Sequence, residues 1–179
     1  MDRLTKQQRS SNMAAIHGKD TKPEMAVRRW LWGHGFRYRL NHPRLPGKPD
    51  IVMRKYRTCI FVNGCFWHGH NVQFATAQIE SSECCKIPKT NREFWVAKIQ
   101  RNQERDTRVL HELAALGWHS ITIWECELKP KVRDKTLESL GFTLNKIFLQ
   151  DRIVKRYEIP EEELMMAAEE IFDNYNKKE

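Results

Sequence analysis

The chain has 179 residues, of which 40% are hydrophobic and 10% aromatic, so it can bury the core of one domain and still carry an appendage. It has no run of about 18 apolar residues, and its first residues lack the apolar core of a secretory signal. We therefore expect a cytoplasmic protein without a membrane span. Its five cysteines are odd in number and do not follow the spacing of a disulfide framework, which favours free or metal-bound thiols.

The charge of the chain is unevenly distributed. Residues 1–110 have 21 Lys and Arg against 9 Asp and Glu, a net of +12, whereas residues 111–179 have 10 against 14, a net of −4. A basic body with an acidic end favours a polyanionic partner, most simply nucleic acid. Solubility alone is the alternative explanation of the charge.

The N-terminal part of the chain predicts an arm, a helix and a strand. Residues 1–20 are polar and basic and have little to bury, so we interpret them as an arm that becomes ordered on a partner. Thr21 and Glu24 form a capping box that predicts the start of a helix. Residues 36–40 alternate apolar and basic, as a strand with one buried face does. The apolar residues of the predicted helix are Val27, Trp30 and Leu31.

A hairpin follows. The turn at residues 45–50 is rigid and leads into a strand at 51–53, and the chain returns as a second strand at 58–63. Neighbouring antiparallel strands bring their loop ends together, which predicts that Asp50 lies near Val62 and Asn63.

The rest of the chain predicts a loop at 71–89, a strand at 118–125 and helices at 136–149 and 161–174, the last strongly acidic. A second capping box, Thr90 to Glu93, predicts a long helix that Gly117 ends. The apolar stripe of that helix is Phe94, Ile99, Val109, Leu110, Leu113 and Leu116.

This order of elements predicts an α/β or α+β fold with a mixed central sheet flanked by helices. We divide the chain into the arm at 1–20, a core at 21–130 and a helical extension at 131–179.

Asp50 is a candidate magnesium ligand. It enters a strand directly after a proline-containing loop in a basic region, and hard cations need oxygen ligands. The alternative is that Asp50 only caps the preceding turn.

Residues 65–70 concentrate groups that carry chemistry. His68 is a candidate general base, because an imidazole can take a proton from water near neutral pH; a surface histidine and a zinc ligand are the alternatives. Phe66 and Trp67, together with Trp95, are candidates for insertion between bases, although a place in the core is the default for aromatic residues.

The cysteines indicate a second metal site. Cys65 and His70 are five positions apart, and Cys126 follows a predicted strand. With Cys84 or Cys85 they would complete a closed tetrahedral zinc site, which is structural chemistry. Buried free thiols are the alternative.

Taken together, these segments closely resemble the very-short-patch repair (Vsr) DNA mismatch endonucleases over roughly residues 9–130. The resemblance rests on the order and composition of several short pieces. These are Asn12-Met13, residues 45–50, residues 61–70, Phe94-Trp95, Lys98-Ile99, Asn102, Arg105-Asp106, residues 116–118 and residues 124–126.

The resemblance implies a restriction-endonuclease-like core with a structural zinc site. It implies a magnesium-dependent nick, with two Mg²⁺ ions expected, in one strand of double-stranded DNA, 5′ to the thymine of a T·G mismatch. Such mismatches arise when 5-methylcytosine deaminates, so the resemblance also implies a functional link to a cytosine-5 DNA methyltransferase. We expect a monomer.

Carried over by position, the resemblance implies roles in hydrolysis for five residues. Asp50 would bind magnesium through its side chain and Val62 through its backbone carbonyl. His68 would act as general base on water, Asp106 would orient the imidazole, and Glu24 would help hold water around the metal.

Further roles concern DNA and zinc. Phe66, Trp67 and Trp95 would wedge into the duplex beside the mismatch, with Met13 entering from the other groove and Asn63 contacting phosphate. The zinc would lie on Cys65, His70, Cys126 and one more thiolate, for which Cys85 is slightly better placed than Cys84, before Lys86-Ile87-Pro88.

Overall fold

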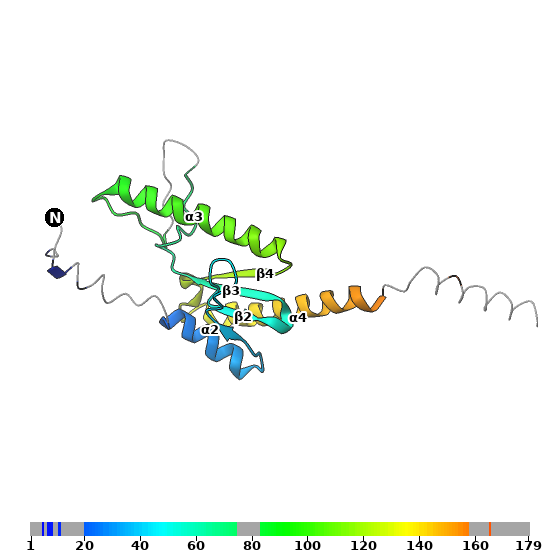
Figure 1. Ribbon diagram of the computed structural model, residues 1–179. Helices are drawn as coiled ribbons and strands as arrows, with labels where there is room; N and C mark the ends of the chain where they lie inside the picture. Colours follow the sequence, from blue (N-terminus) through cyan, green and yellow to red (C-terminus); the bar gives the residue numbers. More distant parts are fainter. Residues whose placement is uncertain are drawn as a thin grey trace, which may run out of the picture. The chain divides into compact units, whose positions relative to one another are not determined.

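The computed structural model describes residues 5, 7–8, 11, 20–74, 83–157 and 165. The chain divides into two compact units, Met1–Gly141 and Phe142–Glu179, and the sheet lies in the first. Met13 and most of the predicted helix at 161–174 lie outside the described residues. The elements in chain order (Figure 1) are helix α2 (Lys22–Gly33), strands β1 (Arg39–Leu40) and β2 (Ile51–Met53), the 3-10 turn η1 (Arg54–Tyr56), strand β3 (Thr58–Asn63), helix α3 (Arg92–Ala115), strand β4 (His119–Trp124), the 3-10 turn η2 (Glu125–Leu128) and helix α4 (Arg133–Tyr157).

The sheet has four strands in the order β1-β2-β3-β4. β2 pairs antiparallel with β1 and with β3, and the predicted hairpin is therefore confirmed. β3 and β4 are parallel, with Val62 opposite Ile123, and α3 lies in the crossover that a parallel pair requires. The expectation of a mixed central sheet flanked by helices is confirmed.

Alternate residues of the hairpin pack on opposite faces of the sheet. Val52 and Cys59, which are opposite each other, pack with Val109 and Leu113 of α3. Their neighbours along the strands, of which Ile60 is fully buried, point to the other face, where α2 lies (Figure 1). The core of this unit is thus built in layers, with α3 on one face and α2 on the other.

The start of α2 follows the predicted capping chemistry. The helix begins at Lys22, directly after Thr21, whose side-chain oxygen accepts the N–H of Glu24 at 3.4 Å. Pro23 occupies the first turn, where its missing N–H costs nothing.

Helix α3 begins within the predicted segment Thr90 to Glu93, but the predicted capping box is wrong. The helix begins at Arg92 with Asn91 as its N-cap, in a left-handed conformation with φ +52°, and no side chain caps the first turn. The predicted end is confirmed, because Gly117 adopts φ +71° just after the helix.

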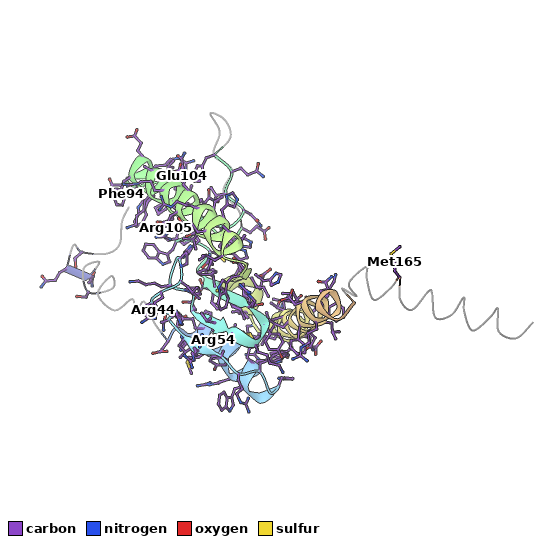
Figure 2. All side chains as sticks on the ribbon, turned by 45° about the vertical axis from the view of Figure 1, so that its right-hand side comes forward. Arg44, Arg54, Phe94, Glu104, Arg105 and Met165 are labelled. Carbon is purple, nitrogen blue, oxygen red and sulfur yellow. The ribbon has the colours of Figure 1, made fainter. Side chains whose placement is uncertain are left out.

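The apolar stripe of α3 is narrower than predicted. Ile99, Val109 and Leu113 are buried, whereas Phe94, at the N-terminal end of the helix (Figure 2), is 54% exposed. Leu110 and Leu116 are exposed as well. In the middle of the helix the inward-facing positions are held by the half-buried polar residues Asn102, Gln103 and Asp106. The apolar contacts of α3 are therefore limited to a few positions.

The described part of the predicted loop at 71–89 has no helix or strand. Among the described residues, no helix is both long and apolar enough to cross a membrane.

Candidate functional site

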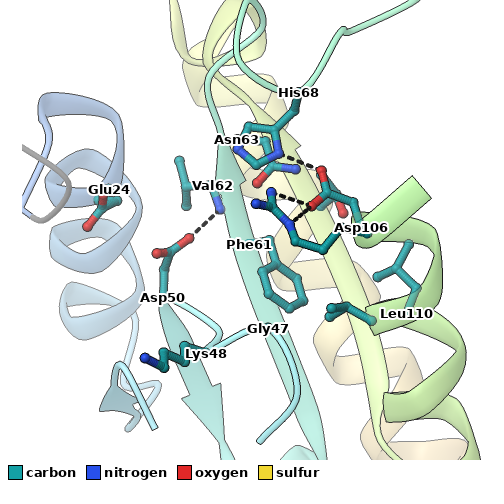
Figure 3. A pocket seen from close by; sticks show the side chains of 13 residues that line it. Glu24, Gly47, Lys48, Asp50, Phe61, Val62, Asn63, His68, Asp106 and Leu110 are labelled. Atoms are coloured by element: carbon teal, nitrogen blue, oxygen red, sulfur yellow. Dashed lines mark hydrogen bonds and ion pairs between the residues drawn. The ribbon is translucent and has the colours of Figure 1, made fainter. Parts of the chain in front are cut away.

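Polar side chains from α2, the β2–β3 hairpin and α3 line a pocket of about 490 Å³ (Figure 3). This pocket unites Glu24, Asp50, Val62, His68 and Asp106, all five residues that the sequence assigned to hydrolysis. The other lining residues are Gly47, Lys48, Phe61, Asn63, Arg105, Val109, Leu110 and Thr122.

Asp50 lies at the start of β2, and the hairpin brings it to the end of β3. The backbone N–H of Val62 donates to Oδ2 of Asp50 at 2.8 Å. Burial raises the pKa of the Asp50 carboxyl, although the hydrogen bond from Val62 lowers it, and the nearby charge of Glu24 raises it further. A cation bound beside Asp50 would stabilise the ionised form of its carboxyl group.

His68 and Asp106 form a hydrogen-bonded pair across the pocket from Asp50. Nδ1 of His68 and Oδ2 of Asp106 are 2.6 Å apart. Arg105 donates to the other oxygen of Asp106 from Nε at 3.2 Å and from Nη2 at 2.8 Å. Burial by itself raises the pKa of Asp106, but the hydrogen bonds and charges of His68 and Arg105 outweigh it and lower the pKa overall.

This arrangement defines the tautomer of a neutral His68. An ionised Asp106 only accepts, so Nδ1 carries the proton and Nε2 is the nitrogen with a lone pair. Asp106 would also stabilise the imidazolium once Nε2 accepts a proton. The pair can therefore act as a general base.

Helix α3 also holds the loop on which His68 lies. Asn102 donates to the carbonyl of Trp67 at 2.7 Å, and Gln103 donates to the carbonyl of Gly69 at 2.8 Å. Gly69 has φ +62°, and a Cβ atom there would lie 2.4 Å from the side chain of Ile99. The backbone of the loop therefore lies directly on α3, in a conformation that favours glycine.

Glu24 lies in the first turn of α2 and is 5% exposed. It lines the pocket, and Figure 3 shows it on the same side as Asp50, opposite His68 and Asp106. Lys48 and Arg105 also line the pocket and supply positive charge near the carboxylates. A pocket with three carboxylates, two cations and an imidazole suits a divalent metal and a phosphate.

A second cluster shares the loop of His68 through Cys65 and His70, and is completed by Cys84 and by Cys126 of η2. The sulfur atoms of Cys65, Cys84 and Cys126 lie 3.8, 3.2 and 3.3 Å from Nδ1 of His70, and the four ligand atoms are within 4.8 Å of one another. Ligand atoms of a tetrahedral zinc site with Zn–S bonds of about 2.3 Å lie roughly 3.3–3.8 Å apart, so this donor set fits zinc. The His70 ring stacks on Trp124, with centroids 4.1 Å apart.

The preference for Cys85 as the fourth ligand needs correction. Cys84 joins the cluster, whereas Cys85 is fully buried in an apolar group with Val72, Ile87 and Ile99. Neighbouring side chains diverge, so only one of the two cysteines can face the cluster while the other fills the core.

Burial raises the pKa of the Cys65 thiol to about 12 and also raises the pKa of Cys126. Without a metal these thiols hold their protons at neutral pH. Zinc binds thiolates, so occupying the cluster must release protons.

The three aromatic residues that the sequence singled out pack together. The ring centroid of Phe66 lies 5.1 Å from those of Trp67 and Trp95, which are 6.1 Å from each other. All three are half-buried, and Phe66 and Trp95 also pack against the apolar group around Ile99. Nζ of Lys98 lies 6.0 Å from the Trp67 ring. The group thus combines an apolar surface with a cation, as stacking sites for bases do.

Sequence reasoning gave no role to Asn102, Gln103 or Arg28. The first two could have been found from helical spacing. Asn102 and Gln103 lie four and three positions before Asp106, and so on the same face of α3. Arg28, four positions after Glu24, is the partner of that carboxylate.

Comparisons with known proteins identify the family of the chain. The profile of the family described as DNA mismatch endonuclease Vsr matches residues 1–74. The type II nicking enzyme V.NmeAIP of Neisseria meningitidis is 48% identical over 132 residues, which are 73% of this chain and 86% of that protein. The type II nicking enzyme V.XorIIP of Xanthomonas oryzae is 41% identical, over 71% of this chain and 86% of that protein. The DNA mismatch endonuclease Vsr of Escherichia coli is 40% identical, over 72% of this chain and 78% of that protein.

The three relatives are 40–48% identical to this chain, and the matched segments cover 78–86% of their own length. Identity at this level over most of the length shows a shared family. The chain therefore belongs to the Vsr family of DNA mismatch endonucleases.

Proposed function

We propose that this protein nicks one strand of double-stranded DNA 5′ to the thymine of a T·G mismatch, by magnesium-dependent hydrolysis of a phosphodiester bond. The observation that carries the proposal is the pocket in which the His68–Asp106 pair, at 2.6 Å, faces Asp50 and Glu24. The names of the relatives, a DNA mismatch endonuclease and type II nicking enzymes, support the reaction class.

In this proposal each polar residue of the pocket has one task. His68 takes a proton from the attacking water at Nε2, while Asp106 holds the imidazole and stabilises its charge. The Asp50 carboxylate and the Val62 carbonyl hold magnesium, with Glu24 helping to hold the surrounding water. When bound, magnesium offsets charge on the phosphate and favours ionisation of water. Lys48 and Arg105 are placed to attract the phosphate.

Recognition of the mismatch is assigned to the aromatic group. Phe66, Trp67 and Trp95 wedge into the duplex, with Met13 entering from the opposite groove and Asn63 contacting phosphate. A T·G pair stacks weakly, so opening the duplex there costs less than the few kcal/mol of a matched step. That difference favours the mismatch. Because T·G pairs arise from deaminated 5-methylcytosine, we also propose a functional link to a cytosine-5 DNA methyltransferase.

The test is a magnesium assay on matched and T·G-mismatched duplexes in a CT(A/T)GG context. We expect a nick only in the thymine strand of the mismatched duplex. Equal cutting of the matched duplex would instead indicate a restriction-type nuclease of the same fold. Binding without cutting of either duplex would leave a zinc-stabilised DNA-binding module and contradict the proposal.

Replacing His68 by alanine should lower the single-turnover nicking rate by about 100-fold or more, because a positioned base contributes that much. Binding of the mismatched duplex, measured by fluorescence anisotropy, should be kept. His111→Ala, at an exposed position on α3, is the matched control and should nick normally. Full activity of His68→Ala would remove this residue from the mechanism.

Asp50→Asn and Asp106→Asn should shift stability in opposite directions in magnesium-free buffer at pH 7. Burial raises the pKa of Asp50 above 3.8, so its ionised form is penalised in the folded state and asparagine should relieve the penalty. The pKa of Asp106 is lowered, so its ionised form adds stability that asparagine should remove.

Both differences should shrink on acidification, that of Asp50 as the pH falls through its raised pKa and that of Asp106 as the pH falls through its lowered one. Urea unfolding at pH 7, pH 4 and about pH 3 measures them, because the pKa of Asp106 lies below 3.8 and its difference should persist at pH 4. Both variants should lose nicking. A destabilised Asp50→Asn protein would show that this carboxylate is a structural cap of the turn.

We also propose that the cysteine–histidine cluster holds one structural zinc ion. Cys84→Ser should lose zinc and stability together, since structural zinc is coupled to folding. Cys85→Ser, at the adjacent position, should keep zinc although it places a hydroxyl in an apolar group. Elemental analysis of the purified variants separates them, and zinc retained by Cys84→Ser but lost by Cys85→Ser would reverse the assignment.

A further inference from the structure

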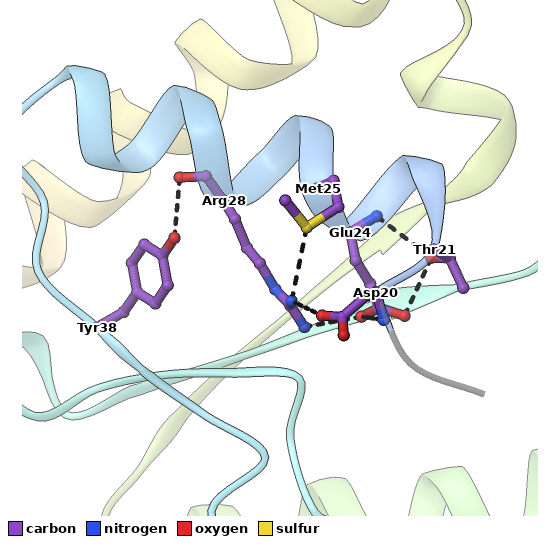
Figure 4. A network of polar contacts seen from close by, with 6 residues as sticks. All are labelled: Asp20, Thr21, Glu24, Met25, Arg28 and Tyr38. Carbon is purple, nitrogen blue, oxygen red and sulfur yellow. Dashed lines mark hydrogen bonds and ion pairs between the residues drawn. The ribbon is translucent and has the colours of Figure 1, made fainter. Parts of the chain in front are cut away.

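Arg28 is a buried arginine on α2 that does not line the pocket but pairs with Glu24, which does (Figure 4). It is 4% exposed, and its Nη2 donates to Oε2 of Glu24 at 2.8 Å. Its Nη1 pairs with the carboxylate of Asp20. The hydroxyl of Tyr38 donates to the Arg28 carbonyl at 3.1 Å, which fixes the helix backbone at this position.

The two terminal nitrogens of the guanidinium therefore bridge two carboxylates. The planar fork of arginine can reach both in one fixed geometry, which a single ammonium cannot do. The third nitrogen, Nε, is buried and has no hydrogen-bond partner among the described residues.

Glu24 is held from several sides and still has room for one more donor. Oε1 accepts from the Thr21 hydroxyl at 3.0 Å. Oε2 accepts from Arg28 and from the backbone N–H of Asp20 at 3.1 Å. A carboxylate has about four acceptor positions, so one remains. Because Glu24 lines the pocket beside Asp50, that position is available to water around a metal there.

We propose that Arg28 is a positioning residue that holds the Glu24 carboxylate at the metal side of the pocket and ties it to Asp20. The inference rests on the role that the proposed function gives to Glu24. Arg28 touches neither metal nor DNA in this account and orients Glu24. Its charge also lowers the pKa of Asp50, and Arg28→Lys keeps that charge, so the substitution tests the orientation.

Asp20 ties this network to the backbone directly before α2. Asp20 is the residue at which residues 1–19 join the core, and it has φ +58°. Both its N–H and its carboxylate are engaged in the Glu24–Arg28 network (Figure 4).

The test uses Arg28→Lys in the full-length protein, because lysine keeps the charge and removes the fork. Arg29→Lys, at the next and exposed position of α2, is the matched control. Each protein is titrated with Mn²⁺ alone, followed by electron paramagnetic resonance, and its nicking rate is measured. Glu24→Gln is made alone and in combination with Arg28→Lys. Together with the wild type and Arg28→Lys, these variants form a double-mutant cycle.

We expect Arg28→Lys to weaken Mn²⁺ binding by about tenfold or more, as loss of an outer partner of a metal site does. Arg29→Lys should bind Mn²⁺ as the wild type does. In the Glu24→Gln background, Arg28→Lys should have no further effect, because Arg28 acts through Glu24. A purely structural role for Arg28 would leave the same effect in both backgrounds.

Several outcomes would overturn the proposal: unchanged Mn²⁺ binding by Arg28→Lys, an equal loss in the Glu24→Gln background, or no Mn²⁺ binding by the wild type. If Arg28→Lys does not fold, Asp20→Asn decides, since its side chain is 70% exposed. It should weaken Mn²⁺ binding by a smaller factor, and unchanged binding would count against the proposal. Expected Mn²⁺ behaviour in a protein that nicks no duplex would sustain the role of Arg28 and refute the proposed function.

Discussion

The hydrogen bond from the Val62 N–H to the Asp50 carboxylate decides where the pocket lies. It joins the start of β2 to the end of β3, at the place where the hairpin register ends. The carboxylate is buried, and one N–H does not offset its lost hydration, so burial still raises its pKa. A divalent cation would supply a counter-charge and so favour the ionised form of Asp50.

The loop after β3 depends on this hairpin at one end and on the cysteine–histidine cluster at the other. Cys65 and His70 both lie in the cluster, so the two ends of the short segment between them are fixed together. Asn102 and Gln103 hold its carbonyls from α3. The residues between the cluster ligands include His68, which must meet its partner Asp106 within a few tenths of an ångström to act as a base. The cluster thus helps to position His68 in the pocket, although the cluster takes no part in the pocket's chemistry.

The sequence was sufficient where the signal was local. The hairpin, the Thr21 cap and the approach of Asp50 to Val62 follow from turn chemistry and strand pairing, which need no distant contact. Sequence reasoning failed where neighbours in space decide. It could not tell whether Cys84 or Cys85 faces the cluster. The answer depends on which of the two side chains points into the core, and that is decided by packing.

Two further misses have the same origin. The Thr90 capping box was wrong because Asn91 turns in a left-handed conformation before α3, which the pattern of side chains does not reveal. Arg28 was overlooked because an arginine four positions after a glutamate is usually a solvated helix pair. Its burial, which makes it informative, is a property of the packed helix.

The central claim is that one pocket holds both the metal and the base. It is tested most directly by a crystal structure of the protein bound to a T·G-mismatched duplex with Mn²⁺, using the anomalous signal to locate the ion. The account predicts Mn²⁺ on the Asp50 carboxylate and the Val62 carbonyl, with Nε2 of His68 facing the phosphate 5′ to the thymine. Mn²⁺ bound away from Asp50, or His68 turned from that phosphate, would contradict it.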